Sequence, residues 1–268
     1  MHRPRKRTSQ LWRRVVEPVR DHYEKHTASE AYRSSRRRKA HVIAHLCGPY
    51  LHGDTIAADL GAGTGLIRKE LEIACDNPIY GIDIDDSFIV ERERMVLGDV
   101  LRLPLASESL DYAMLNHLYE HVPDPGALFR ETYRVLRPGG RAYVTAGSRR
   151  AVMEPHYRLP FLSWLPPKVA GAYVRASGRG DGYEDIRFLT YRPLVRLMRS
   201  AGFVVRDITE QAINDLVGLA WGPRWGAAWQ AIQRIPAGLR ASMLRAGSPQ
   251  WFFLLERPGR PDDVRGGS

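Results

Sequence analysis

"AADLGAGTGLIR", at residues 57–68, places three glycines within five positions directly after a short apolar run that contains an aspartate. The run itself, "TIAADL" at residues 55–60, is partly β-branched and bounded by turn residues, which is typical of a buried parallel strand. A glycine turn after such a strand, followed by a helix through Cys75, is typical of α/β folds that bind nucleotides. This stretch therefore predicts the start of an α/β sheet with a ligand at its first turn.

Further strands are spaced along the chain with helices between them. They are predicted at residues 78–83, 95–99, 110–116 and 141–147, after Gly202, and at 250–257. Strands that alternate with helices at this spacing predict a doubly wound, seven-stranded, mostly parallel sheet covered on both faces. Ligands of such sheets bind at the carboxyl ends of the strands.

The length of 268 residues fits one large domain with additions. We expect a basic disordered arm at 1–9, a single domain at 10–257 and a disordered tail at 258–268. Within the domain we expect N-terminal helices at 10–51, a ligand-binding core at 52–147, an insertion at 148–188, a helix and strand at 189–209, a second insertion at 210–248, and the last strand at 249–257. Both insertions are longer than simple connections, so we expect them to form a lid that carries specificity.

The positive charge is concentrated at the N-terminus. Residues 1–40 hold thirteen Lys/Arg and four Asp/Glu, or +9, so 27 minus 26, or +1, remains for the rest of the chain's total of +10. The runs "RPRKR" (3–7) and "RRRK" (36–39) could hold phosphates of RNA or of anionic lipid. The alternative is a solvated helical face beside a frayed terminus.

The cysteine count and the apolar runs indicate a compartment. Cys47 and Cys75 are too few for a disulfide framework and have no metal-ligand spacing, so we expect a reducing cytoplasm and no bound metal. There is neither a signal-peptide stretch nor a run of about 20 apolar residues. We therefore expect a cytoplasmic protein, with peripheral contact at the inner face of the membrane as a further possibility.

The glycine spacing discriminates between nucleotide ligands. A phosphate-binding P-loop requires a lysine that is absent, and the dinucleotide fingerprint requires a third glycine where Leu66 stands. The NAD interpretation is weakened but not removed. Asp59 beside the glycines favours a ligand whose nearby group is cationic.

Five stretches together resemble the class I S-adenosylmethionine-dependent methyltransferases, and most closely their ubiquinone/menaquinone-type small-molecule branch. They are "DLGAGTG" (59–65), "GIDIDD" (81–86), "LGDVLRLPLASESLDYAMLN" (97–116), "LYEHVPDP" (118–125) and "YRVLRPGG" (133–140). The resemblance implies a Rossmann-like methyltransferase fold and S-adenosylmethionine as the cofactor.

The resemblance also implies a role for each matching position. Asp59 would lie near the methionine end of the cofactor, and Asp83 would accept hydrogen bonds from both ribose hydroxyls. Asp99 would face the adenine amino group, with a helix cap for Asp83 and a turn role for Asp99 as the structural alternatives. The full expected set is Asp59, Gly61, Ala62, Gly63, Gly65, Asp83, Ile84, Asp99, Val100 and Asn116. One departure is that only fifteen residues separate Asp83 from Asp99, which predicts a short helix and an open flank of the adenine pocket.

Methyl transfer requires alignment and exclusion of water, and a base only if the acceptor must lose a proton. The candidates are His117 and His121 near the fourth strand and His156 in the first insertion. For each, a hydrogen-bonded structural histidine is the alternative.

The two insertions suggest an apolar acceptor. "EPHYRLPFLSWLPPKVAGAYV" (154–174) mixes aromatic, apolar and proline residues, and residues 216–244 hold three tryptophans with amphipathic character. Helices that only cover the sheet would explain the same pattern, and docking on a membrane together with the basic terminus is a further interpretation.

We therefore expect methylation of a small-molecule, lipid-linked or sugar-linked acceptor, most readily at oxygen and next at carbon. An RNA methyltransferase that uses the basic terminus is the alternative. It is disfavoured because "NHLY" (116–119) replaces the Asn/Asp-Pro-Pro-aromatic motif of amino-methylating enzymes. A non-catalytic module that binds the cofactor and a partner is a third reading. The oligomeric state stays open.

Overall fold

A computed structural model describes residues 29–260, except 88, 184–185 and 220–222; the side chains of 218–225 are also not described. The expected basic arm (1–9), the helix expected before residue 29 and most of the expected tail lie outside the described residues.

A single seven-stranded sheet runs through the domain in the order β3-β2-β1-β4-β5-β7-β6. Its strands are β1 (Ala57–Leu60), β2 (Ile79–Asp83), β3 (Met95–Leu97), β4 (Leu110–Asn116), β5 (Leu136–Gly147), β6 (Val204–Asp207) and β7 (Gln250–Glu256). Strands β1 to β5 pair in parallel, whereas β7 is antiparallel to both β5 and β6. The predicted doubly wound, mostly parallel sheet is confirmed.

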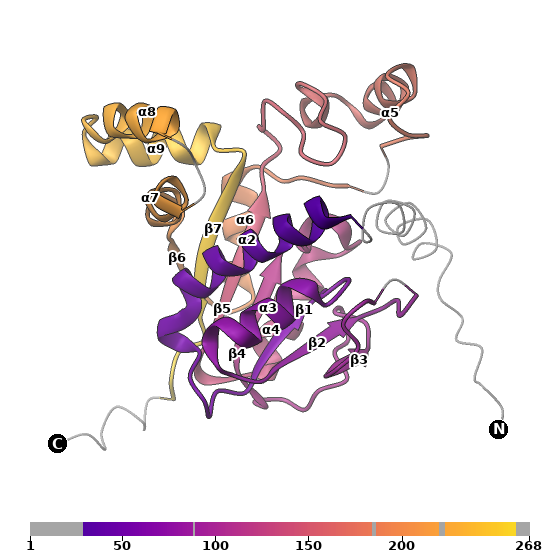
Figure 1. Ribbon diagram of the computed structural model, residues 1–268, viewed down its shortest axis with the longest axis vertical. Helices are drawn as coiled ribbons and strands as arrows, with labels where there is room; N and C mark the ends of the chain where they lie inside the picture. Colours follow the sequence, from indigo (N-terminus) through magenta and orange to yellow (C-terminus); the bar gives the residue numbers. More distant parts are fainter. Residues whose placement is uncertain (1–28, 88, 184–185, 220–222, 261–268) are drawn as a thin grey trace.

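Helices cover both faces of the sheet (Figure 1). On one face, α2 (Glu30–Cys47), α3 (Leu66–Cys75) and α7 (Thr209–Leu219) pack over a core that includes Leu71, Ile79 and Ala212. On the other face, α4 (Pro125–Val135) and α6 (Tyr191–Ser200) pack over a second core. Because both faces are buried, β1 contains only buried residues and lacks the alternation of a half-exposed strand.

The two insertions fold differently. The first carries η3 (Leu162–Trp164) and α5 (Pro167–Ala176) around a small core of its own that includes Leu162, Val174 and Tyr183. Figure 1 shows it projecting beyond the end of the sheet. The second continues from α7 into α8 (Pro223–Gln233) and α9 (Ala237–Gly247), which contact one another. Trp229 of α8 is buried and its indole N–H donates to Asn214 Oδ1.

The short helix expected between Asp83 and Asp99 is wrong for the described part of that link, because 84–87 and 89–94 contain no helix. The link instead passes over the glycine turn, where the N–H groups of Val90 and Glu91 each donate to the carbonyl of Thr64 over 3.0 Å. Backbone donors used in this way cannot also form a helical ladder.

Among the described helices, none is both long and apolar enough to cross a bilayer.

Candidate active site

The glycine turn at the carboxyl end of β1 has a backbone that other residues rarely adopt. Gly61, Gly63 and Gly65 have φ of 72°, 57° and 77°. A Cβ at Gly61 would lie 2.5 Å from Leu118 Cδ1, and one at Gly65 would lie 2.6 Å from the Glu91 carbonyl. Glycine is therefore favoured at Gly61 and Gly65 for two reasons: the positive φ, and the neighbouring atoms that a Cβ would contact. Ala62, whose N–H donates to Ile82 O over 3.1 Å, completes the turn.

Two buried carboxylates flank this turn. Asp83 ends β2, and its Oδ2 accepts from the N–H of Gly63 at 2.8 Å while its Oδ1 accepts from Asp85 at 3.2 Å. Burial raises the pKa of Asp83, and these two bonds oppose the rise. An ionised carboxylate has about four acceptor positions, so capacity remains for a ligand. The expected alternative of a helix cap does not apply, because no described helix follows Asp83.

Asp59 lies in β1 with 4% of its surface exposed, and no residue of the described chain forms a hydrogen bond with its carboxylate. Burial raises its pKa to about 7, an effect that Arg68 opposes and Asp83 reinforces. A carboxylate that no protein group hydrogen-bonds takes its donors from water or from a ligand. Asp59 therefore fits a cationic ligand group.

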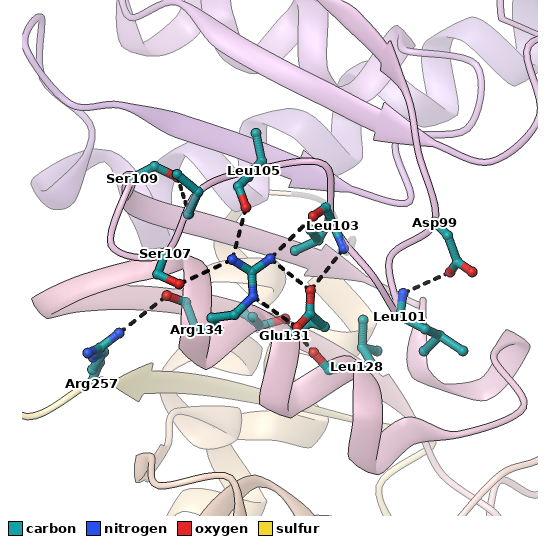
Figure 2. Close-up of polar contacts among 12 residues, drawn as sticks. Asp99, Leu101, Leu103, Leu105, Ser107, Ser109, Leu128, Glu131, Arg134 and Arg257 are labelled. Atoms are coloured by element: carbon teal, nitrogen blue, oxygen red, sulfur yellow. Dashed lines mark hydrogen bonds and ion pairs between the residues drawn. The ribbon is translucent and has the colours of Figure 1, made fainter.

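The loop after β3 is held in place by an ion pair on α4, as Figure 2 shows. The guanidinium of Arg134 donates to the carbonyl oxygens of Leu105 at 2.9 Å and Leu103 at 3.2 Å, and to Glu131. Glu131 also accepts from the Leu103 N–H at 2.9 Å. The ion pair thereby fixes the loop that begins at Asp99.

Asp99 itself caps a turn, because its Oδ1 accepts from Leu101 N–H at 2.8 Å. The turn role that the sequence left as the alternative is therefore present, and it leaves Oδ2 available for a ligand. Val100 is buried and Ile84 is partly buried. Asn116 ends β4 and is also partly buried. Their roles toward a cofactor remain predictions.

The three candidate bases lie together. His117 follows β4 with φ of 53°, and its N–H donates to Thr145 O at 3.0 Å. Its Nδ1 lies 3.0 Å from Oε1 of Glu120, a fully buried side chain in η2 (Tyr119–His121). Burial lowers the pKa of His117, and the charge of Lys39 on α2 lowers it further while Glu120 opposes both.

The other two histidines are in contact. His156 lies in the tight loop between Met153 and Pro160, and its Nδ1 is 2.7 Å from Oε1 of the buried Glu154. Its ring meets that of His121 edge to face, with 5.2 Å between centroids. Burial lowers the pKa of His121 to about 4, so His121 is a weak base. The first insertion thus brings a second histidine–carboxylate pair to the end of β4.

Sequence reasoning missed Glu120, Glu154 and Lys39. Glu120 stands three residues after His117, and such a pair meets on a 3-10 turn, so a His-x-x-Glu spacing was the available signal. Burial alone would raise the pKa of Glu120, but the bond from His117 and the charges of His117 and His121 lower it below its usual value. Burial lowers the pKa of Lys39 to about 8, and no pattern in the sequence indicates that this lysine faces the site.

No group of three or more His, Cys, Asp or Glu side chains is placed to hold a metal ion in the part of the chain that the structure describes.

Comparison with known proteins agrees with this geometry. Residues 58–144 match the family model described as a methyltransferase domain. An uncharacterized 37.1 kDa protein in transposon TN4556 of Streptomyces fradiae is 34% identical over 61% of this chain and 50% of its own. The ubiquinone/menaquinone biosynthesis C-methyltransferase UbiE of Desulfotalea psychrophila is 26% identical over 61% of this chain and 71% of its own.

A solved structure shows the same fold. The Haemonchus contortus phosphoethanolamine N-methyltransferase 2, in complex with S-adenosyl-L-methionine, superposes with a TM-score of 0.51 at 17% identity, over 83% of this chain and 52% of that one. Residues 58–144 therefore resemble a methyltransferase domain, and the solved structure shares the fold of this chain. The chain spans half the length of the Streptomyces relative that it matches.

The residues present fit S-adenosylmethionine. The unpartnered carboxylate of Asp59 suits the ammonium of the methionine end, and Asp83 has acceptor positions for a ribose diol. The glycine turn between them exposes backbone where a side chain would obstruct the ligand. These assignments to single residues remain proposals.

Proposed function

We propose that this chain transfers a methyl group from S-adenosylmethionine to a hydroxyl oxygen of a small-molecule, lipid-linked or sugar-linked acceptor. The observation that carries the proposal is the pair of His117, which is partly buried, and the fully buried Glu120, beside Asn116 at the end of β4. UbiE is named a C-methyltransferase, so that relative does not select oxygen. The histidine–carboxylate pair favours oxygen because a hydroxyl must lose its proton during the transfer.

The cofactor, when bound, supplies a methyl group on a sulfonium. His117 would take up at Nε2 the proton that the acceptor hydroxyl loses when it is methylated. Nδ1–H of His117 would donate a hydrogen bond to Oε1 of Glu120 over 3.0 Å, which leaves Nε2 as the proton acceptor. Because burial lowers the pKa of His117, the imidazole is neutral at pH 7, as a base must be.

The backbone of His117 supports a functional role. A φ of 53° is uncommon for a residue with a side chain and costs about 1–3 kcal/mol, so the surrounding structure must enforce it. The bond from its N–H to Thr145 O and the bond from its ring to Glu120 do so together. Backbone strain of this kind is concentrated at functional sites. Here it sets the direction of the His117 side chain, the first after β4.

The buried Oε2 of Glu120 and the buried hydroxyl of Tyr183 have no hydrogen-bond partner within the described residues. The pKa of Tyr183 is raised, chiefly by burial and then by the charges of Glu154 and Glu120, so these groups share one region. An acceptor with a second polar group beside the reacting hydroxyl would satisfy them. His156, whose Nδ1 lies 2.7 Å from Glu154, would contact that acceptor from the side of the first insertion.

The test is incubation of the full chain with S-adenosylmethionine labelled at the methyl group and fractions of phenolic, sugar and lipid-linked alcohols. Mass spectrometry then locates the label in the product. A methyl ether supports the proposal, and a methyl group on carbon or nitrogen contradicts it.

A further inference from the structure

The outer end of the first insertion exposes large apolar side chains. Val152 is 55% exposed, Met153 51%, Phe161 49% and Trp164 50%. We call these four residues the apolar tip. The Phe161 and Trp164 rings meet edge to face at 5.4 Å, and the Phe161 N–H donates to Val152 O at 2.6 Å. The Phe161 and Trp164 rings therefore form one aromatic surface, and the backbone of Val152 lies beside Phe161.

The conformation of the tip is enforced by the fold. Phe161 has φ of 57°, which is unusual for an aromatic residue and turns the chain sharply before η3. The indole N–H of Trp164 donates to Ala151 O at 3.0 Å, so its polar atom is satisfied while half of the ring stays exposed. Beneath the tip, Leu162 and Ala151 are buried. The exposure is thus a property of a packed element.

The exposed charge of residues 149–169, the segment that carries the tip, has one sign. Within 149–169 the exposed charged side chains are Arg149, Arg150, Arg158 and Lys168, and the segment's one carboxylate, Glu154, is fully buried against His156. None of the four cations has an ion pair with a described residue. Exposed aromatic and apolar side chains with a basic rim match the interface of an anionic bilayer, in which rings lie at headgroup depth and cations meet lipid phosphates.

We propose that the apolar tip docks the protein on anionic membrane, so that the lipid-linked class of acceptor reaches the site from the bilayer. The inference rests on the proposed function for the identity of the acceptor, but docking is measured without turnover. The tip and the site are one unit of chain, because the loop between Met153 and Pro160 carries His156.

Docking is tested by sedimentation of the full chain with vesicles of phosphatidylcholine, with and without phosphatidylglycerol. We expect binding only with phosphatidylglycerol. Arg150→Glu with Arg158→Glu should weaken this binding about tenfold or more, since each basic residue near such a surface contributes about a factor of five. Separately, Met153→Glu places a charge in the apolar tip and should weaken the binding by about tenfold or more as well. These side chains are exposed, so the variants should keep the wild-type melting temperature.

Leu239→Glu is the matched control, because Leu239 on α9 is an exposed apolar residue, 58% exposed, of the second insertion. Arg3→Gln with Arg5→Gln and Arg7→Gln tests the basic arm. The proposal would be overturned if the Leu239 variant or the basic-arm variant lost vesicle binding while the tip variants kept it. Equal binding to vesicles with and without phosphatidylglycerol would also overturn it. A vesicle-independent dimer that Met153→Glu dissociates would also overturn it. Failure to methylate any acceptor, with tip-dependent binding intact, would count against the proposed function alone.

Discussion

Nδ1 of His117 lies 3.0 Å from Oε1 of the fully buried Glu120, and this contact joins the end of β4 to the turn that follows it. Two effects on the histidine oppose each other: burial lowers its pKa, whereas the carboxylate raises it. The pair thus combines a neutral imidazole with a fixed ring orientation.

The pH dependence of methyl transfer should report this pair. Because the pKa of His117 is lowered, the rate should decrease only below the ordinary histidine range near 6.5. Glu120→Gln removes the group that raises this pKa, so the acidic limb should shift to lower pH and the plateau rate should decrease. His41→Ala, an exposed histidine of α2, is the control. An unshifted limb in Glu120→Gln would show that the carboxylate is only structural.

Asp83→Ala should weaken S-adenosylmethionine binding about a hundredfold, because two charge-assisted hydrogen bonds to the ribose would be lost at about 1.5 kcal/mol or more each. Calorimetry on the full chain measures the dissociation constant. Asp86→Ala removes an exposed carboxylate from the same turn and should leave it unchanged. Equal affinity of wild type and Asp83→Ala would remove Asp83 from the ribose site.

Asp59 should release a proton when the cofactor binds near pH 7. Burial raises its pKa to about 7, so part of the free protein is protonated there, and a cationic ligand group favours the carboxylate. Binding enthalpies in buffers of different ionisation enthalpy measure this release, which Asp59→Asn should abolish. If the proton release persists in Asp59→Asn, a group other than Asp59 releases the proton.

The same raised pKa affects the stability of the free protein. Between about pH 4, where an unfolded aspartate ionises, and pH 7, the native carboxyl holds a proton that the unfolded chain has lost. This contribution to the free energy of unfolding is present below pH 4 and lost as the pH rises to 7. Denaturant titrations across this range should show a smaller decrease in Asp59→Asn than in wild type.

Arg134→Ala should loosen the loop that carries Asp99 and Val100. It leaves the carbonyl oxygens of Leu103 and Leu105 without their donor, so we expect a loss of about 1–3 kcal/mol in stability and weaker cofactor binding. Thermal melts and hydrogen exchange over 99–109 measure the loss of stability, and calorimetry measures the affinity for S-adenosylmethionine. Arg130→Ala, on the same helix with only a 3.5 Å contact to Asp124, should change neither. Faster hydrogen exchange in both variants would show that Arg134 does not specifically stabilise this loop.

The sequence predicted those parts of the site that depend on local pattern. The glycine turn and Asp83 each follow a parallel strand, and the carboxyl ends of parallel strands lie along one edge of the sheet. Their place in the site could therefore be predicted from the sequence. The link between β2 and β3 was predicted wrongly as a helix, because its backbone donors to Thr64 come from tertiary contact. The sequence named His156 as a candidate base, but its contacts with His121 and Glu154 could not be predicted, since they depend on how the first insertion folds.

The most direct test of the central claim is single-turnover methyl transfer by His117→Ala once a labelled product has been found. We expect a product methylated on oxygen in wild type, and a rate at least about a hundredfold lower in His117→Ala with unchanged affinity for S-adenosylmethionine. A product methylated on carbon, or an unchanged rate in His117→Ala, would contradict the assignment of His117 and Glu120 as the proton-accepting pair.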